Sequence, residues 1–181
     1  RIALQQGRTQ DARTHLLAAL DLAEGRGPSE ARVLNLLAGV HHAVGEHDSA
    51  LDCLHSAVRL HRELGDRAGE AKGLTNVGSI LVAQGEYVAA LEYLVAAHEL
   101  FRSAVNDERA RGVTLINLGN LFLDLGQPGS AAEYFREALG VARGRRDRLM
   151  ESVALLNLGT ALGRTDDPGA EAALRLALDL A

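Results

Sequence analysis

The sequence is poor in several residue types, and each shortage narrows the classes of protein that it can encode. A single cysteine in 181 residues rules out an internal disulfide and fits a reducing cytoplasm. Aromatic residues make up only 3% of the chain, which leaves few platforms for stacking nucleic-acid bases, and the net charge of −5 disfavours a nucleic-acid surface. No apolar run approaches the roughly 20 residues of a membrane span, and no signal-peptide pattern is present. The composition predicts a cytoplasmic protein with neither a nucleic acid nor a membrane as its partner.

Motifs that carry catalytic chemistry are also missing. The sequence contains no phosphate-binding loop, no nucleophile elbow and no paired carboxylates at a catalytic spacing. We therefore expect a protein that is not an enzyme, has no catalytic residue and uses no cofactor.

One pattern is repeated through the whole chain instead. Turn glycines recur at steps of 38, 40 and 41 residues, and each is followed by alanine five and twelve positions later. A large apolar residue lies nine positions after each glycine, and a small residue lies seven positions before the last three of them. A regular period in this range is the signature of a stacked repeat array. The turn glycines are Gly7, Gly45, Gly85 and Gly126.

Each copy predicts two amphipathic α-helices. In the first helix, apolar or small residues recur at i, i+3, i+4 and i+7, which is the spacing of one helical face. The second helix keeps the same spacing around its recurrent alanines. No segment shows the alternation of a β-strand. Aspartates that suit helix N-caps lie between the copies, at Asp66, Asp107 and Asp147.

Three glycines recur inside the predicted first helices, at Gly78, Gly119 and Gly159. Glycine in a helix interior costs about 1 kcal/mol relative to alanine, so this recurrence predicts a packing role. The last copy is one residue shorter than the others, and we expect its turn one position early, at Thr165.

We expect an all-α protein of nine helices, arranged as one domain over residues 1–181. The chain opens without methionine, and the apolar pattern still continues at its last residues, so we expect a fragment of a longer protein. The array divides into a half repeat at 1–27 and repeats at 28–66, 67–106, 107–147 and 148–181.

The repeated pattern resembles the tetratricopeptide repeat over essentially the whole chain. The resemblance implies a right-handed α-solenoid of stacked antiparallel helix pairs, with a concave groove that binds other proteins. The period here is close to 40 residues rather than 34, and arginine replaces the closing proline, as in the long-repeat type of the family. The matching residues in one copy are Leu115, Leu118, Gly119, Phe122, Gly126, Ala131, Phe135 and Ala138.

Asparagine recurs at one place in three successive copies, two positions before the glycine inside the first helix. The resemblance implies that this face lines the groove, where a side-chain amide can both donate to and accept from the main chain of an extended peptide. Alternatively, these asparagines bond neighbouring helices and only keep the repeats in register. The candidate peptide-binding residues are Asn76, Asn117 and Asn157, with Asn120 and Ser79 one turn further along and Asn35 beside the equivalent position in the second copy.

Two cations lie one turn earlier on the same face. Arg32 and Lys72 are equivalent to each other, and Val113 and Val153 replace them in the later copies. A groove that is cationic at one end and apolar at the other would suit a partner with an acidic end and a hydrophobic anchor. The alternative is that both are ordinary solvated charges.

Seven histidines raise the question of a metal site. His41 occupies an apolar position, so we expect it to pack in the core, and a turn separates His42 from His47. No cysteine or carboxylate recurs at ligand spacing, so we predict no metal. Cys53 takes the place of a tyrosine in later copies and is expected to be packed.

These observations favour a protein-interaction scaffold that holds an extended peptide or a helix of a partner protein. Two alternatives remain open. The chain is a regulatory or sensor segment of a larger bacterial signalling or transcription-regulating protein, or it is a structural module that self-associates through the exposed ends of the array.

Overall fold

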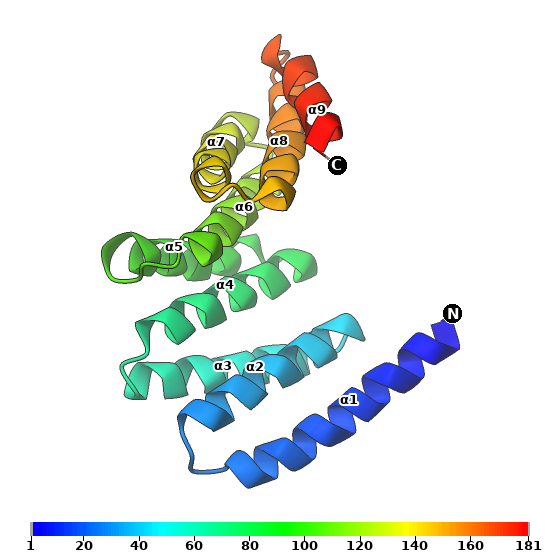
Figure 1. Ribbon diagram of the computed structural model, residues 1–181, viewed down its shortest axis with the longest axis vertical. Helices are drawn as coiled ribbons and strands as arrows, with labels where there is room; N and C mark the ends of the chain where they lie inside the picture. Colours follow the sequence, from blue (N-terminus) through cyan, green and yellow to red (C-terminus); the bar gives the residue numbers. More distant parts are fainter. Residues whose placement is uncertain (1, 181) are drawn as a thin grey trace.

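Nine α-helices follow one another in the computed structural model, which describes the backbone of residues 2–180 and side chains from residue 10 to residue 180 (Figure 1). No strand occurs within residues 2–180, so the predicted all-α solenoid of antiparallel helix pairs is confirmed. The helices are α1 (Ile2–Ala23), α2 (Pro28–Ala43), α3 (His47–Glu63), α4 (Arg67–Gln84), α5 (Tyr87–Ser103), α6 (Glu108–Asp124), α7 (Pro128–Arg145), α8 (Arg148–Gly163) and α9 (Gly169–Leu180).

The helices form a stack in chain order, from α1 at one end to α9 at the other (Figure 1). Each helix packs against the next one along the chain. Among the first helices of the pairs, α6 also contacts α4 and α8.

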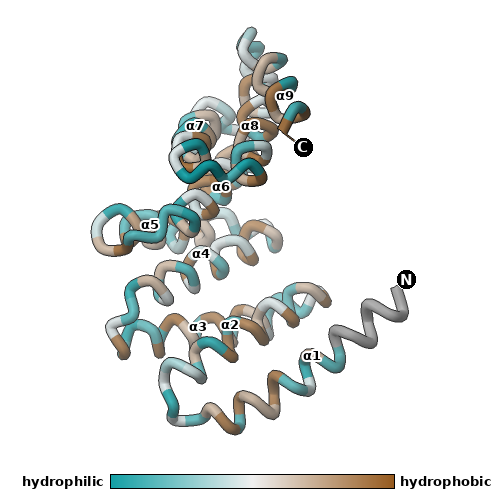
Figure 2. The backbone as a smooth tube through the Cα atoms, in the orientation of Figure 1, coloured by the Kyte–Doolittle hydropathy of each residue, from teal (hydrophilic) through white to brown (hydrophobic). Residues whose placement is uncertain are grey.

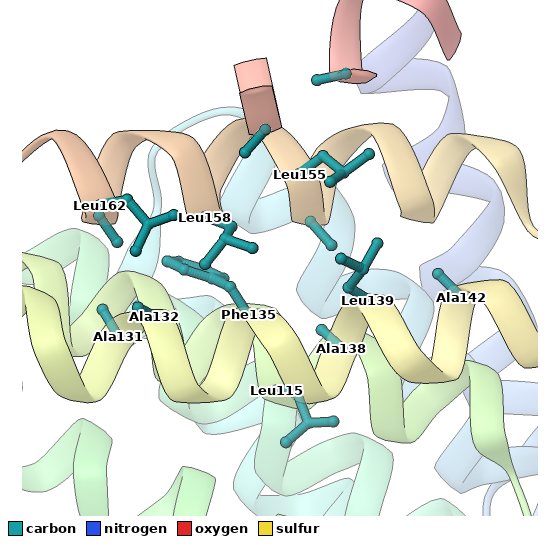
Figure 3. Packing of buried hydrophobic residues seen from close by; sticks show 14 of the residues in the cluster. Leu115, Ala131, Ala132, Phe135, Ala138, Leu139, Ala142, Leu155, Leu158 and Leu162 are labelled. Carbon is teal, nitrogen blue, oxygen red and sulfur yellow. The ribbon is translucent and has the colours of Figure 1, made fainter. Parts of the chain in front are cut away.

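Small and large residues alternate where the helices cross. Ala90 and Ala131 are completely buried, as predicted from their recurrence. The glycines inside the first helices have the expected packing role: a Cβ added at Gly119 would overlap the ring of Phe135. That ring reaches from α7 to Leu158 of α8 in Figure 3 and is completely buried. Gly78 and Gly159 meet leucines of α5 and α9 in the same way.

The predicted N-caps are present. The carboxylates of Asp66, Asp107 and Asp147 accept hydrogen bonds from backbone N–H groups three residues later, at 2.9 to 3.0 Å. Each aspartate thereby satisfies one of the unpaired N–H groups at the start of α4, α6 or α8. The aspartates therefore fix where the first helix of each of these pairs begins.

The last turn differs from the prediction. The turn residues Gly45, Gly85 and Gly126 adopt positive φ angles of 82°, 80° and 70°. In the last pair the positive φ of 53° belongs to Asp166, not to Thr165. The turn residue therefore follows Gly159 at the same spacing as Gly126 follows Gly119. The missing residue of this copy falls after the turn, between the turn and α9.

Polar and apolar segments alternate along the helices, which gives most of them one face toward a neighbour and one toward solvent (Figure 2). Among the described residues, none of the helices combines the length and the apolar character that crossing a membrane requires.

Candidate functional site

Two neighbouring hollows lie between the first helices, and Asn76 of α4 lines both of them. The hollow between α2 and α4 has a volume of about 150 Å³, and Asn35, Gly39 and Ser79 contribute to its wall. The hollow between α4 and α6 has a volume of about 290 Å³, and Lys72 contributes to its wall. The structure thus brings four of the predicted peptide-binding residues, Asn35, Lys72, Asn76 and Ser79, to two adjoining depressions.

The three recurrent asparagines, Asn76, Asn117 and Asn157, differ in their surroundings. Asn76 is exposed and Asn117 is half-buried, and neither side chain forms a hydrogen bond with the rest of the described chain. Asn157 Nδ2, in contrast, donates to Asn120 Oδ1 at 3.2 Å, which links α8 to α6. A peptide-binding role for all three asparagines implies that their amides make no bond within the chain. This is wrong for Asn157, whose bond to Asn120 suits the alternative of keeping the repeats in register.

The charge of Lys72 is largely balanced within the protein. Its Nζ atom lies 2.7 Å from Asp107 Oδ2, so the predicted selector of partner charge is already in an ion pair. Lys72, followed by the backbone N–H of Ala110, holds the pKa of the Asp107 carboxyl below its ordinary value. Arg109, which also lines the α4–α6 hollow, lies 3.8 Å from Asp147 and remains largely exposed. Arg109 is thus the more available cation of this hollow, although its position in the repeat did not single it out.

The later copies present aliphatic side chains where the earlier ones present cations. Arg32 is exposed on α2, and the equivalent Val113 and Val153 are exposed on α6 and α8. The change from cationic to aliphatic side chains that the sequence predicts along the array therefore lies at solvent-exposed positions.

A buried polar pair holds α4 to α6 beneath this surface. The hydroxyls of Thr75 and Thr114 lie 2.8 Å apart, and Thr75 also donates to the carbonyl of Ala71. Both threonines are buried. In the sequence, Thr75 stands out only because the equivalent residues of the later copies, Ile116 and Leu156, are apolar. Its partner Thr114 lies 39 residues away, and the repeat spacing does not predict their contact.

Asn35 is held by polar groups of α3 and of the turn between α3 and α4. Its Nδ2 atom lies 3.1 Å from Nε2 of the buried His61, and His61 Nδ1 lies 2.9 Å from Asp66 Oδ2. Its Oδ1 atom is buried and has no hydrogen-bond partner among the described residues. The repeat pattern predicts Asn35 near the groove, but it carries no signal that His61 is its neighbour.

The histidines serve packing and turns. His41 is buried, as expected, and its Nδ1 atom lies 2.6 Å from Glu46 Oε2, which lowers the pKa of the Glu46 carboxyl. The Nδ1 atoms of His42 and His47 lie 3.3 Å apart across the α2–α3 turn. No cluster of three metal-ligating side chains occurs within the described residues. Cys53 is half-buried, and burial raises the pKa of its thiol.

Known proteins share both the sequence pattern and the fold. The chain is 32% identical over 170 residues to the regulatory protein AfsR of Streptomyces griseus, a match that covers 91% of this chain but only 16% of that protein. The crystal structure of BtubC from P. vanneervenii superposes with a TM-score of 0.86 at 22% identity, covering 98% of this chain and 74% of that one. A Rap protein in complex with competence and sporulation factor gives a TM-score of 0.82 at 17% identity, over 98% of this chain and 50% of that one.

A family model also matches the sequence in two segments. The model of the tetratricopeptide repeat matches residues 1–63 and 69–144, which is more than half of the chain. Folds of this kind are typical of protein-interaction modules and generally carry no catalysis of their own. The chain therefore belongs to the tetratricopeptide repeat family.

Proposed function

We propose that this chain is a protein-interaction module that binds an extended peptide of a partner across α2, α4 and α6. The observation that carries the proposal is the place of Asn76. Its side chain is exposed, has no hydrogen bond to the described chain and lines two adjoining hollows. A side-chain amide at such a junction can donate to the carbonyl and accept from the N–H of one residue of an extended peptide, whatever side chain that residue carries.

The hollows on either side of Asn76 supply places for the side chains of the peptide. The α4–α6 hollow combines the exposed guanidinium of Arg109 with the aliphatic Val113, which suits an acidic residue followed by an aliphatic one. Asn117, on the next first helix, also has no hydrogen-bond partner among the described residues and can bind the main chain further along.

A regulatory role is a second candidate, and the relationship to AfsR favours it. That relative is a regulatory protein at 32% identity, and the chain corresponds to a small part of its length. On this view, peptide binding by the array controls a domain joined to it. The gene sequence on both sides of Arg1 and Ala181 discriminates the candidates: a DNA-binding or catalytic domain there supports regulation, and polar capping helices support a free adaptor.

Selection from a displayed library of random peptides, followed by affinity measurement, tests the peptide-binding proposal. We expect Asn76→Ala to weaken the selected peptide by about 1–3 kcal/mol, or about 5- to 150-fold in Kd, because a bound peptide group loses its partner. Asn106→Ala is the matched control, since Asn106 is an exposed asparagine of the α5–α6 loop. Equal Kd values for the wild type and Asn76→Ala, with both proteins folded, would contradict the proposal.

A further inference from the structure

Two histidines face each other across the α2–α3 turn. The Nδ1 atoms of His42 and His47 lie 3.3 Å apart, and their ring centroids lie 5.2 Å apart. Two imidazole nitrogens bound to one tetrahedral zinc ion at about 2.0–2.1 Å lie about 3.3–3.4 Å apart, with ring centroids about 5.2 Å apart. Both distances in this pair therefore match those of two ligands of a single metal ion.

A hydrogen bond between the two rings accounts for these distances less well. A straight N–H···N bond at this separation would hold the ring centroids about 5.6 Å apart. The shorter distance means that the line from at least one ring through its Nδ1 atom misses the other nitrogen. Within residues 10–180, neither ring has another hydrogen-bond partner. His42 is exposed and His47 is half-buried, so an ion can reach the pair from solvent.

The backbone of the turn fixes the separation of the two residues. Gly45 has a positive φ of 82°. Its N–H donates to the carbonyl of His42 at 3.0 Å, and the next N–H donates to the carbonyl of His41 at 2.9 Å. These two bonds form the Schellman arrangement that ends a helix. The turn thus holds both imidazoles in place before an ion binds, which lowers the entropy cost of binding.

The stacking of repeats does not require a polar pair at these positions. The equivalent residues are Val82 and Tyr87 in the next copy, and Leu123 and Pro128 in the copy after it. The expectation of no metal rested on the turn that separates the two histidines in sequence. In the folded chain, this turn brings their nitrogens together.

We propose that His42 and His47 bind one transition-metal ion through their Nδ1 atoms, with water in the remaining positions of its coordination shell. Imidazole is a ligand that suits Zn²⁺, Ni²⁺ and Cu²⁺. Among the described residues, no third ligating side chain joins the pair, so the ion is held less tightly than at a closed four-ligand site. The ion joins the end of α2 to the start of α3. This inference needs no bound peptide and is independent of the proposed function.

Calorimetric titration of the tag-free chain with Zn²⁺ tests the proposal. We expect one ion per chain, and a loss of at least tenfold in affinity for His42→Ala and for His47→Ala, because each variant keeps only one of the two ligands. His15→Ala is the matched control, since His15 is an exposed histidine of α1, and it should change the affinity less than twofold. Unchanged affinity in both His42→Ala and His47→Ala would contradict the proposal.

NMR of the ¹⁵N-labelled histidine rings identifies the ligating atoms in the wild type, so it does not depend on the folding of any variant. We expect one equivalent of Zn²⁺ to shift the Nδ1 signals of His42 and His47 together, with the ring protons on Nε2. Shifts that report binding at Nε2 alone, or at His55 and not at this pair, would overturn the proposal.

Discussion

Side-chain size at single positions decides how closely the helices of this array can approach. Gly119 lies against the ring of Phe135, and an added Cβ would come within 2.7 Å of ring atoms. Gly39 of α2 lies one position past the place equivalent to Gly119, and an added Cβ there would meet no atom within 4 Å. The same residue type is thus required for packing at one site and not at the other.

These two glycines give a matched pair of substitutions. We expect Gly119→Ala to destabilise the fold by about 1 kcal/mol, because overpacking costs about 1–3 kcal/mol and helix propensity returns only about 1 kcal/mol. Gly39→Ala should stabilise by about 1 kcal/mol, since only the propensity changes. Urea unfolding of both variants measures the difference. A stabilised Gly119→Ala would show that the α6–α7 crossing is loose.

The ion pair between Lys72 and Asp107 predicts a dependence of stability on pH. The pKa of Asp107 is lowered in the folded protein, so its contribution is fully present above the ordinary pKa of about 3.9 and is lost as the pH falls through the lower folded value. Asp107→Asn keeps an N-cap side chain but loses the charge. We expect it to be less stable than the wild type by no more than about 1 kcal/mol near pH 7.

Thermal melts of the wild type and Asp107→Asn from pH 2 to pH 7 provide the measurement. The gap between the two melting temperatures should close as the pH falls below about 4. A gap that is constant over this range would mean that the charge of Asp107 contributes nothing to stability.

At the scale of helices and turns, much of the fold could be predicted because the repeats carry local signals for helix starts and turns. Asp107 starts α6 and Gly126 ends its turn, and both signals act through nearby backbone groups. Asp166 was harder to identify, because aspartate can adopt a left-handed turn but does not demand it as glycine does. The bond between Asn157 and Asn120 could not be predicted at all, since it depends on how two helices are placed in space.

The turn before α9 therefore offers a stabilising substitution. Asp166 has a φ of 53°, where a residue with a Cβ is strained and glycine is not. We expect Asp166→Gly to raise the stability by up to about 1 kcal/mol, and Gly126→Ala, at a φ of 70°, to lower it by about as much. Differential scanning calorimetry tests both. A lower melting temperature for Asp166→Gly would show that its side chain has a role of its own.

At the scale of the whole molecule, the array presents an uncovered apolar surface on α9. Leu178 is 76% exposed, whereas Leu139, at the equivalent place in the preceding repeat, is only 8% exposed because it packs against α8. Exposed aliphatic side chains at a position that other repeats cover are typical of a contact surface.

We expect the 181-residue chain to self-associate through this surface. Light scattering over a concentration series should show a rise in mass for the wild type and a smaller one for Leu178→Glu. Val88→Glu is the control, because Val88 is 77% exposed on α5, away from α9. A strictly monomeric wild type at high concentration would count against the prediction.

The placement of the bound peptide tests the central claim most directly. Amide chemical-shift mapping of the ¹⁵N-labelled chain, titrated with the selected peptide, reports which residues meet it. The peptide-groove account predicts that the largest shifts include the side-chain amides of Asn76 and Asn117 and the backbone of Gly39, on α2, α4 and α6. Shifts confined to the second helices α3, α5 and α7, or to the α8–α9 end, would contradict it.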